Sequence, residues 1–168
     1  MKTSDITKLA TEQRNPRSRD IDRLATKEMV ELINSEDKKV AGAVEKVCPQ
    51  IAAAIDLIYT RMKRGGRLIY CGCGTSGRLG ILDASECTPT YSVSPETVQA
   101  VIAGGNNAVF NAVEGAEDSA ELGAEDMRRL ALTENDTLVG IAASGRTPYV
   151  LGAMKAAHAA GAGLIGLT

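Results

Sequence analysis

The sequence predicts an α/β protein with three layers, in which helices cover both faces of a parallel sheet. Two observations lead to this prediction. Short apolar runs alternate with stretches of helical character, and the runs cover residues 68–73, 98–103, 137–142 and 163–167. None of the runs shows strict polar and apolar alternation, which is typical of parallel strands buried on both faces. Alternating strands and helices imply right-handed crossovers within one sheet.

The first third of the chain is expected to be helical. Apolar residues recur at helical spacing over residues 21–33, and the polar run at 34–37 is expected to end that helix. A second helix is expected over residues 38–47. Pro49 then begins a third helix, which the glycine pair at 65–66 ends.

The sheet region begins after these helices. We therefore divide the chain into an N-terminal helical segment, residues 1–64, and a sheet domain, residues 65–168. Within the sheet domain, helices are expected over residues 77–86, 108–130 and 148–160, between the strands.

Composition excludes several classes of function. The 168 residues carry a formal net charge of −2, contain no tryptophan and are only 3% aromatic, so neither a basic surface nor stacking rings favour nucleic acid. No apolar run is long enough to cross a bilayer, and the polar N-terminus does not resemble a secretion signal. We expect a cytoplasmic protein with no nucleic-acid or membrane partner.

The cysteines and the single histidine argue against metal and cofactor chemistry. Cys48, Cys71, Cys73 and Cys87 form no C-x-x-C pair and have no zinc-ligand spacing. His158 lies late in an expected helix, where a surface position is typical. We therefore expect no metal and no cofactor, and we expect carboxylates to carry any acid–base chemistry.

Two turns between a strand and a helix have the features of an anion site. Both contain Ser-Gly-Arg, and in both, backbone N–H groups and a helix N-terminus would point at one spot. Ordinary helix capping is the alternative interpretation, which two matched turns at one sheet edge disfavour. The candidate binding residues are Gly74, Thr75, Ser76, Ser144, Gly145 and Thr147.

Nucleotide ligands fit these turns poorly. Gly72 to Gly77 match the G-x-G-x-x-G pattern, but the second strand ends at residues 102–105 without the acid that would hold a ribose. The Walker pattern fails because Arg78 and Leu79 stand where Lys and Ser or Thr are required. A small phosphorylated sugar is the ligand class that the hydroxyl-rich turns favour.

The chain resembles a known family in three motifs, at residues 72–90, 112–118 and 143–150, and in an N-terminal motif at 11–15. These motifs are similar to those of the N-acetylmuramic acid 6-phosphate etherases, enzymes with a sugar isomerase (SIS) domain. The resemblance implies the SIS fold and cleavage of the lactyl ether, which yields D-lactate and N-acetylglucosamine 6-phosphate in cell-wall recycling. It also implies homodimers with active sites near the shared interface.

By the same resemblance, Glu86 matches the proton donor to the departing lactate, and Glu117 matches the second catalytic acid, the base at C2. Glu86 is expected to end the helix that starts at Gly77, to be partly buried and protonated, and to face Glu117. Glu117 belongs to an acidic run, residues 114–126, whose ordinary interpretation is a solvated helix face.

Several alternatives stay open at this point. Arg78 and Arg146 could bind phosphate or pair with carboxylates. A phosphosugar isomerase and a non-catalytic sugar-phosphate-binding regulator are both compatible with the fold, and lactate release separates them from an etherase. Because the family continues beyond the strand in which this sequence stops, we expect a truncated or fragment form with an incomplete sheet.

Overall fold

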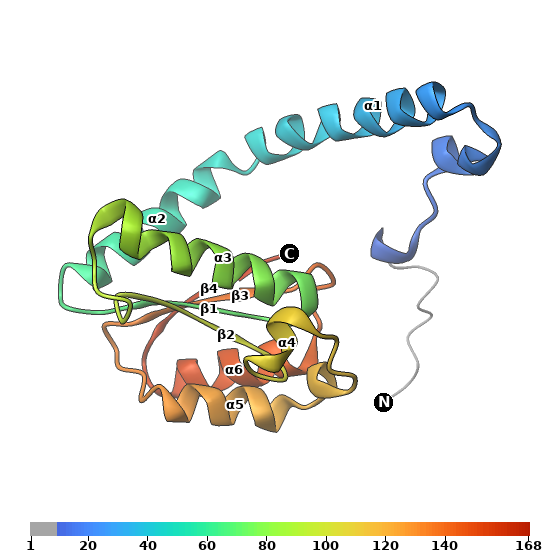
Figure 1. Cartoon of the computed structure of the whole chain (residues 1–168). Coiled ribbons are helices and arrows are strands. Elements are labelled where there is room, and N and C mark those ends of the chain that lie inside the picture. The colour runs from blue at the N-terminus through green and yellow to red at the C-terminus, as the bar shows by residue number, and fades with distance from the viewer. Residues whose placement is uncertain (1–9) are drawn as a thin grey trace. The chain divides into compact units, whose positions relative to one another are not determined.

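The computed structural model describes residues 10–168, which form two compact units that divide between Ala53 and Ala54. The N-terminal unit holds three short 3-10 helices and α1, and α2 runs across the division (Figure 1). The bounds of these elements are η2 (Ala10–Glu12), η3 (Pro16–Ser18), η4 (Ile21–Arg23), α1 (Thr26–Glu45) and α2 (Cys48–Met62).

Helix α1 is continuous where the sequence analysis expected a break at residues 34–37, so that expectation is wrong. The polar side chains there find partners without leaving the helix. The Ser35 hydroxyl donates to a carbonyl one turn earlier at 2.7 Å, and the Glu36 carboxylate accepts from Lys39 at 2.7 Å and also from Arg17. Satisfied in this way, these residues no longer compete with the helix backbone.

The sheet has four parallel strands in the order β2-β1-β3-β4. Each begins at the residue predicted from its apolar run and ends within one residue of it, so the predicted strands are confirmed. Strand β4 lies at the edge of the sheet, and its Leu167 is exposed. The bounds are β1 (Leu68–Gly72), β2 (Val98–Ile102), β3 (Thr137–Ile141) and β4 (Gly163–Leu167).

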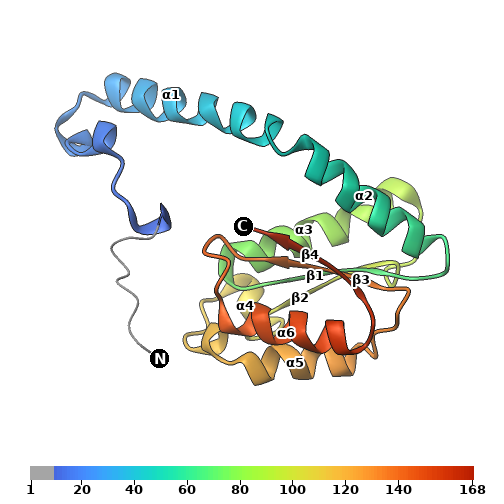
Figure 2. The same cartoon turned by 180° about the vertical axis from the view of Figure 1, so that it is seen from behind.

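Helices cover both faces of this sheet, which confirms the predicted three-layer fold (Figures 1 and 2). Alternate residues of β1 divide between the faces: Ile69 and Cys71 pack with α5 and α6, whereas Leu68 and Tyr70 pack with α3 and the end of α2. The remaining elements are α3 (Gly74–Tyr91), α4 (Asn107–Phe110), η5 (Ala116–Asp118), α5 (Ala120–Arg129) and α6 (Pro148–Ala159).

The single helix expected over residues 108–130 is wrong, because three elements occupy that range. Gly115 adopts a left-handed conformation with φ of 74°, which interrupts the helix. Ser119 then caps α5, since its hydroxyl oxygen accepts from the Leu122 N–H at 3.2 Å. The first residues of the acidic run therefore lie before α5, in a turn and in the 3-10 helix η5, and not on the face of one long helix. This connection between α4 and α5 is called the loop below.

Helix α3 is longer than the predicted range of 77–86. It starts at Gly74 and continues past Pro89, which is exposed at the C-terminal end, where water can solvate the carbonyl that loses its partner. The helix ends where Ser92 adopts a left-handed conformation.

Helices α5 and α6 are in backbone contact. A Cβ atom added to Gly152 would lie 1.9 Å from the Ala120 oxygen, and one added to Gly123 would lie 2.0 Å from the Tyr149 oxygen. Such close approach leaves no room for a methyl group at Gly123 of α5 or at Gly152 of α6.

One ion pair, between the buried Asp136 and the partly exposed Arg67, fixes the ends of β1 and β3 opposite the turns. The Asp136 carboxylate accepts from the Arg67 backbone N–H at 2.8 Å, from its guanidinium at 2.7 and 3.0 Å, and from the Thr133 N–H at 2.8 Å. Burial alone would raise the pKa of Asp136, but the bonds from Arg67 and Thr133 outweigh it and lower the pKa to about 2.

We expect Asp136→Asn to destabilise the fold by about 3 kcal/mol at neutral pH, because it leaves the Arg67 charge without its buried partner. The folded pKa lies below the unfolded value, so the charged carboxylate stabilises above about pH 4, and this stabilisation is lost as pH falls towards about 2. Urea unfolding at several pH values measures the effect. Glu125→Gln, at an exposed carboxylate, is the control, and a difference from wild type that does not shrink at low pH contradicts the prediction.

Gly152→Ala should destabilise the protein by about 2 kcal/mol through overpacking of α6 against α5. Gly42→Ala is the matched control, because a Cβ on this α1 glycine meets nothing within 4 Å. Alanine should stabilise that helix by about 0.5–1 kcal/mol. Urea unfolding followed by circular dichroism compares the two, and equal effects would show that the helix contact does not exist.

Candidate functional site

At the carboxyl ends of the neighbouring strands β1 and β3, the chain continues to opposite sides of the sheet, towards β2 from β1 and towards β4 from β3. Helix α3 leads from β1 to β2, whereas α6 leads from β3 to β4, and the two central strands are neighbours. Gly72 pairs with Ile141, so both strands end at the same edge. Ligands of parallel α/β sheets bind at such a position. The two predicted turns follow these two strands, as expected.

The first turn presents the N-terminus of an 18-residue helix, α3. Gly74 adopts a left-handed conformation with φ of 52°, and Thr75 and Ser76 follow in the first turn of the helix. The chain folds tightly here, since a Cβ on Gly72 would lie 2.6 Å from the Gly77 nitrogen. The first N–H groups of a helix have no acceptor within it and can bind an anion.

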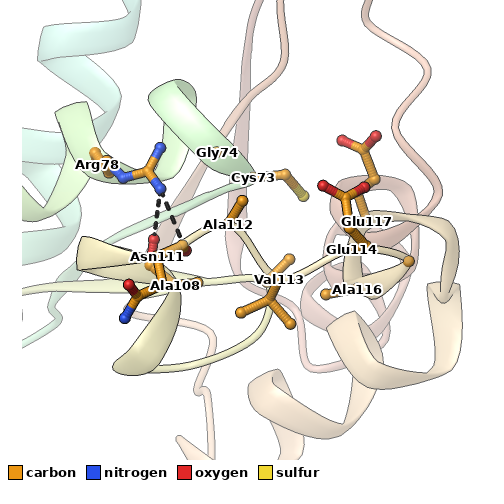
Figure 3. Close-up of a pocket in the computed structure, with 12 residues that line it drawn as sticks. Cys73, Gly74, Arg78, Ala108, Asn111, Ala112, Val113, Glu114, Ala116 and Glu117 are labelled. Carbon is orange, nitrogen blue, oxygen red and sulfur yellow. Dashed lines mark hydrogen bonds between the residues drawn. The ribbon is translucent and has the colours of Figure 1, made fainter.

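A pocket of about 180 Å³ opens beside this turn (Figure 3). It brings together Gly74 and Glu117, two of the predicted site residues, from segments far apart in the sequence. Glu114 also lines it and was not among the predicted site residues. The other lining residues are Cys73, Arg78, Ala103, Ala108, Asn111, Ala112, Val113, Gly115 and Ala116.

The Glu117 carboxylate lies close enough to Cys73, at the start of the first turn, to affect its pKa. Burial, followed by the negative charge of Glu117, raises the pKa of the Cys73 thiol to about 11. Cys73 therefore stays protonated at neutral pH and is not a nucleophile. Glu114 and Glu117 are both exposed and project to the same side of their loop (Figure 3). The pocket thus holds two exposed carboxylates next to the N-terminus of α3.

The second turn is built similarly but lies outside this pocket. The Ser144 hydroxyl accepts from the Arg146 N–H at 3.3 Å, and Gly145 has a φ of 63°. Thr147 occupies the N-cap position of α6, although its side chain makes no capping bond. Gly145 and Thr147 line a separate cavity of about 110 Å³ that Thr168 also borders.

Glu86 lies away from both turns. It is inside α3 and not at its end, 12 residues after Gly74, which corresponds to about 18 Å along the helix. Its side chain is exposed, so the expected partial burial is wrong for this chain. Glu86 does not line the pocket that holds Glu117.

The two arginines of the turns have different surroundings. Among residues 10–168, Arg78 bonds to backbone carbonyl oxygens and has no carboxylate partner, whereas Arg146 is exposed, which leaves its role open. Over residues 10–168 no three His, Cys, Asp or Glu side chains gather as a metal site would require. No helix in that range is long and apolar enough to span a bilayer.

Comparisons with known proteins agree with this architecture. Residues 50–158 match the family model of the glucokinase regulatory protein N-terminal SIS domain. The N-acetylmuramic acid 6-phosphate etherase of Clostridium beijerinckii is 58% identical over 168 residues, which is 100% of this chain and 55% of that protein. The protein of the same name from Aliivibrio fischeri is 61% identical over 158 residues, 94% of this chain and 53% of its own length.

Solved structures show the same fold at low identity. Phosphoheptose isomerase from Neisseria gonorrhoeae superposes with a TM-score of 0.68 at 24% identity, over 84% of this chain and 74% of that one. A phosphoheptose isomerase from Francisella tularensis gives 0.56 at 23% identity, over 83% and 74%. The chain spans about half the length of the curated relatives it matches. It belongs to the family of the glucokinase regulatory protein N-terminal SIS domain and corresponds to the N-terminal portion of its etherase relatives.

Proposed function

We propose that this protein acts on N-acetylmuramic acid 6-phosphate and cleaves its C3 lactyl ether by elimination of D-lactate and addition of water. The observation that carries the proposal is that Glu117 lines one pocket together with Gly74. Gly74 belongs to the first turn, residues 72–77, which we call the phosphate turn because we propose that it binds the phosphate. The names of relatives at 58–61% identity support the same substrate. The proposed setting is the cytoplasm, during recycling of cell-wall sugars.

The chemistry assigns a base and an acid. In the open-chain sugar, the C1 aldehyde acidifies the C2 proton, and Glu117 takes that proton. The electron pair of the C2–H bond becomes the C2=C3 double bond, and the C3–O bond breaks with its electrons on the lactyl oxygen. Glu86 supplies the proton to that oxygen. Water then adds at C3, and a proton returns to C2. Thr75 and Ser76, with Ser144, Gly145 and Thr147 of the second turn, are proposed to hold the sugar phosphate.

Glu117→Gln should lower kcat for D-lactate release by about 1,000-fold, because the amide cannot accept the C2 proton. The assay is D-lactate formation from N-acetylmuramic acid 6-phosphate by the full-length gene product, coupled to D-lactate dehydrogenase. Glu125→Gln, on the neighbouring helix α5, is the control and should keep wild-type turnover. Full turnover by the Glu117 variant would contradict the assignment. A wild-type protein that isomerises sugar phosphates without releasing lactate would be an isomerase, and one that binds without turnover would be a regulator.

We further propose that the active form is a homodimer and that Glu86 acts in the pocket of the second copy. Leu79 and Leu82 precede Glu86 on one face of α3, and both are exposed, at 56% and 59%. An apolar face of this kind favours a protein partner. In the other unit, α1 has no buried residue and also exposes large apolar side chains. The pocket itself, at about 180 Å³, is smaller than the roughly 300–1,000 Å³ usual for ligand sites.

Hybrid dimers test this arrangement. If Glu86 acts across the interface, mixing Glu86→Gln and Glu117→Gln proteins should restore activity, because one site of each hybrid then has both carboxylates. Random exchange of equal amounts gives roughly a quarter of wild-type activity, since half the dimers are hybrids with one working site. The two variants are mixed after reversible dissociation and assayed for lactate. No recovery, with hybrid dimers verified by a tag on one variant, would place both carboxylates in the same chain.

A further inference from the structure

Arg78 makes an unusual set of contacts for a residue beside an anion site. It lies one helical turn after Gly74, and its guanidinium donates to three carbonyl oxygens of one short segment. Nε donates to Val109 at 2.8 Å. Nη2 donates to Ala108 at 2.8 Å and to Asn111 at 3.5 Å (Figure 3). No ion pair of Arg78 is present among residues 10–168, so these carbonyls are its partners.

The bonded carbonyls belong to a segment that has little stability of its own. Helix α4 has four residues, and the last carbonyl groups of any helix lack partners within it. A helix this short is not stable alone, because nucleation costs more than one or two hydrogen bonds return. Charged hydrogen bonds from a guanidinium are stronger than neutral ones, so Arg78 stabilises the C-terminal end of α4.

The loop that carries Glu117 begins where these bonds end. Asn111 caps α4, and residues 112–117 lead from it along the pocket. Two apolar contacts support the loop further on: Val113 packs against Gly104, and Ala116 is buried. Arg78 is thus a direct link from α3, whose first turn forms the phosphate site, to the loop with the carboxylate.

We infer that Arg78 is a positioning residue that fixes the distance between the phosphate turn and Glu117, an inference that rests on the proposed function. Its Nε and Nη2 already donate to carbonyl oxygens, so turning these two nitrogens towards a phosphate would break the attachment of the loop. The kinetics of a variant tell the two roles apart. A phosphate ligand acts on KM, whereas a residue that positions the base acts on kcat.

Arg78→Met, which keeps the apolar stem, should lower kcat for lactate release by about 100-fold, since a displacement of the base by about 1 Å has an effect of that size. KM for the sugar phosphate should change less than about threefold, because the first turn of α3 stays intact. Arg78→Lys retains the charge and can bond to one carbonyl, so it should recover part of kcat. An unchanged kcat with a raised KM would overturn the inference and make Arg78 a phosphate ligand.

Hydrogen–deuterium exchange gives a readout that does not depend on activity. In Arg78→Met, peptides that cover residues 108–118 should exchange faster, while those of β1 stay protected. Arg146→Met is the matched control from the other Ser-Gly-Arg turn and should leave residues 108–118 unchanged. Unaltered exchange of residues 108–118 in Arg78→Met overturns the positioning role. A wild-type protein that releases no lactate overturns the proposed function instead. In that case the exchange result still shows whether Arg78 holds residues 108–118 in place.

Discussion

The buried pair of Asp136 and Arg67 is the interaction on which the rest of the structure depends. These residues directly precede β3 and β1, and the carboxylate bonds to both the backbone and the guanidinium of Arg67. The pair therefore sets which residues of the two central strands lie opposite each other, starting with Leu68 and Thr137. Because both strands have five residues, they end together, and their turns meet at one edge. The register of β1 and β3, set where the two strands begin, therefore determines where the two turns lie at the ends of these strands.

The two walls of the pocket have different origins. The first turn, which is the proposed phosphate site, follows directly from β1 and is held by the sheet and by close packing of Gly72 on Gly77. The loop with Glu117 follows β2 through a four-residue helix and is held by side-chain contacts with α3 and with Gly104. The first wall is fixed by the fold, whereas the second depends on a few particular residues. Changes in the second wall can alter chemistry without altering the fold.

The sequence predicted the parts of the site that the sheet fixes, and it missed the parts that depend on a few individual contacts. The strands were predictable because apolar runs bounded by glycine and polar residues are a local signal, and the turns after them share Ser-Gly-Arg. The interrupted helix was not, because Gly115 and Ser119 act through backbone conformation and a single capping bond. The partners of Arg78 were hidden as well, since backbone carbonyls some 30 residues away carry no side-chain signature. Among the acidic residues, only the fold separates those in the pocket from those on α5.

Glu86 and Glu117 lie apart in one chain, and the proposed elimination gives a reason why different surroundings would suit them. A proton donor and a base must have different affinities for a proton, so their surroundings must differ. Glu114 and Glu117 are both exposed and line the same pocket, so their surroundings are similar. Glu86 stands on α3 beside the exposed Leu79 and Leu82, a surface that would give it apolar surroundings in the proposed dimer. In the proposed dimer, Glu86 and Glu117 would therefore have different surroundings, and the loop held by Arg78 would present the proposed base.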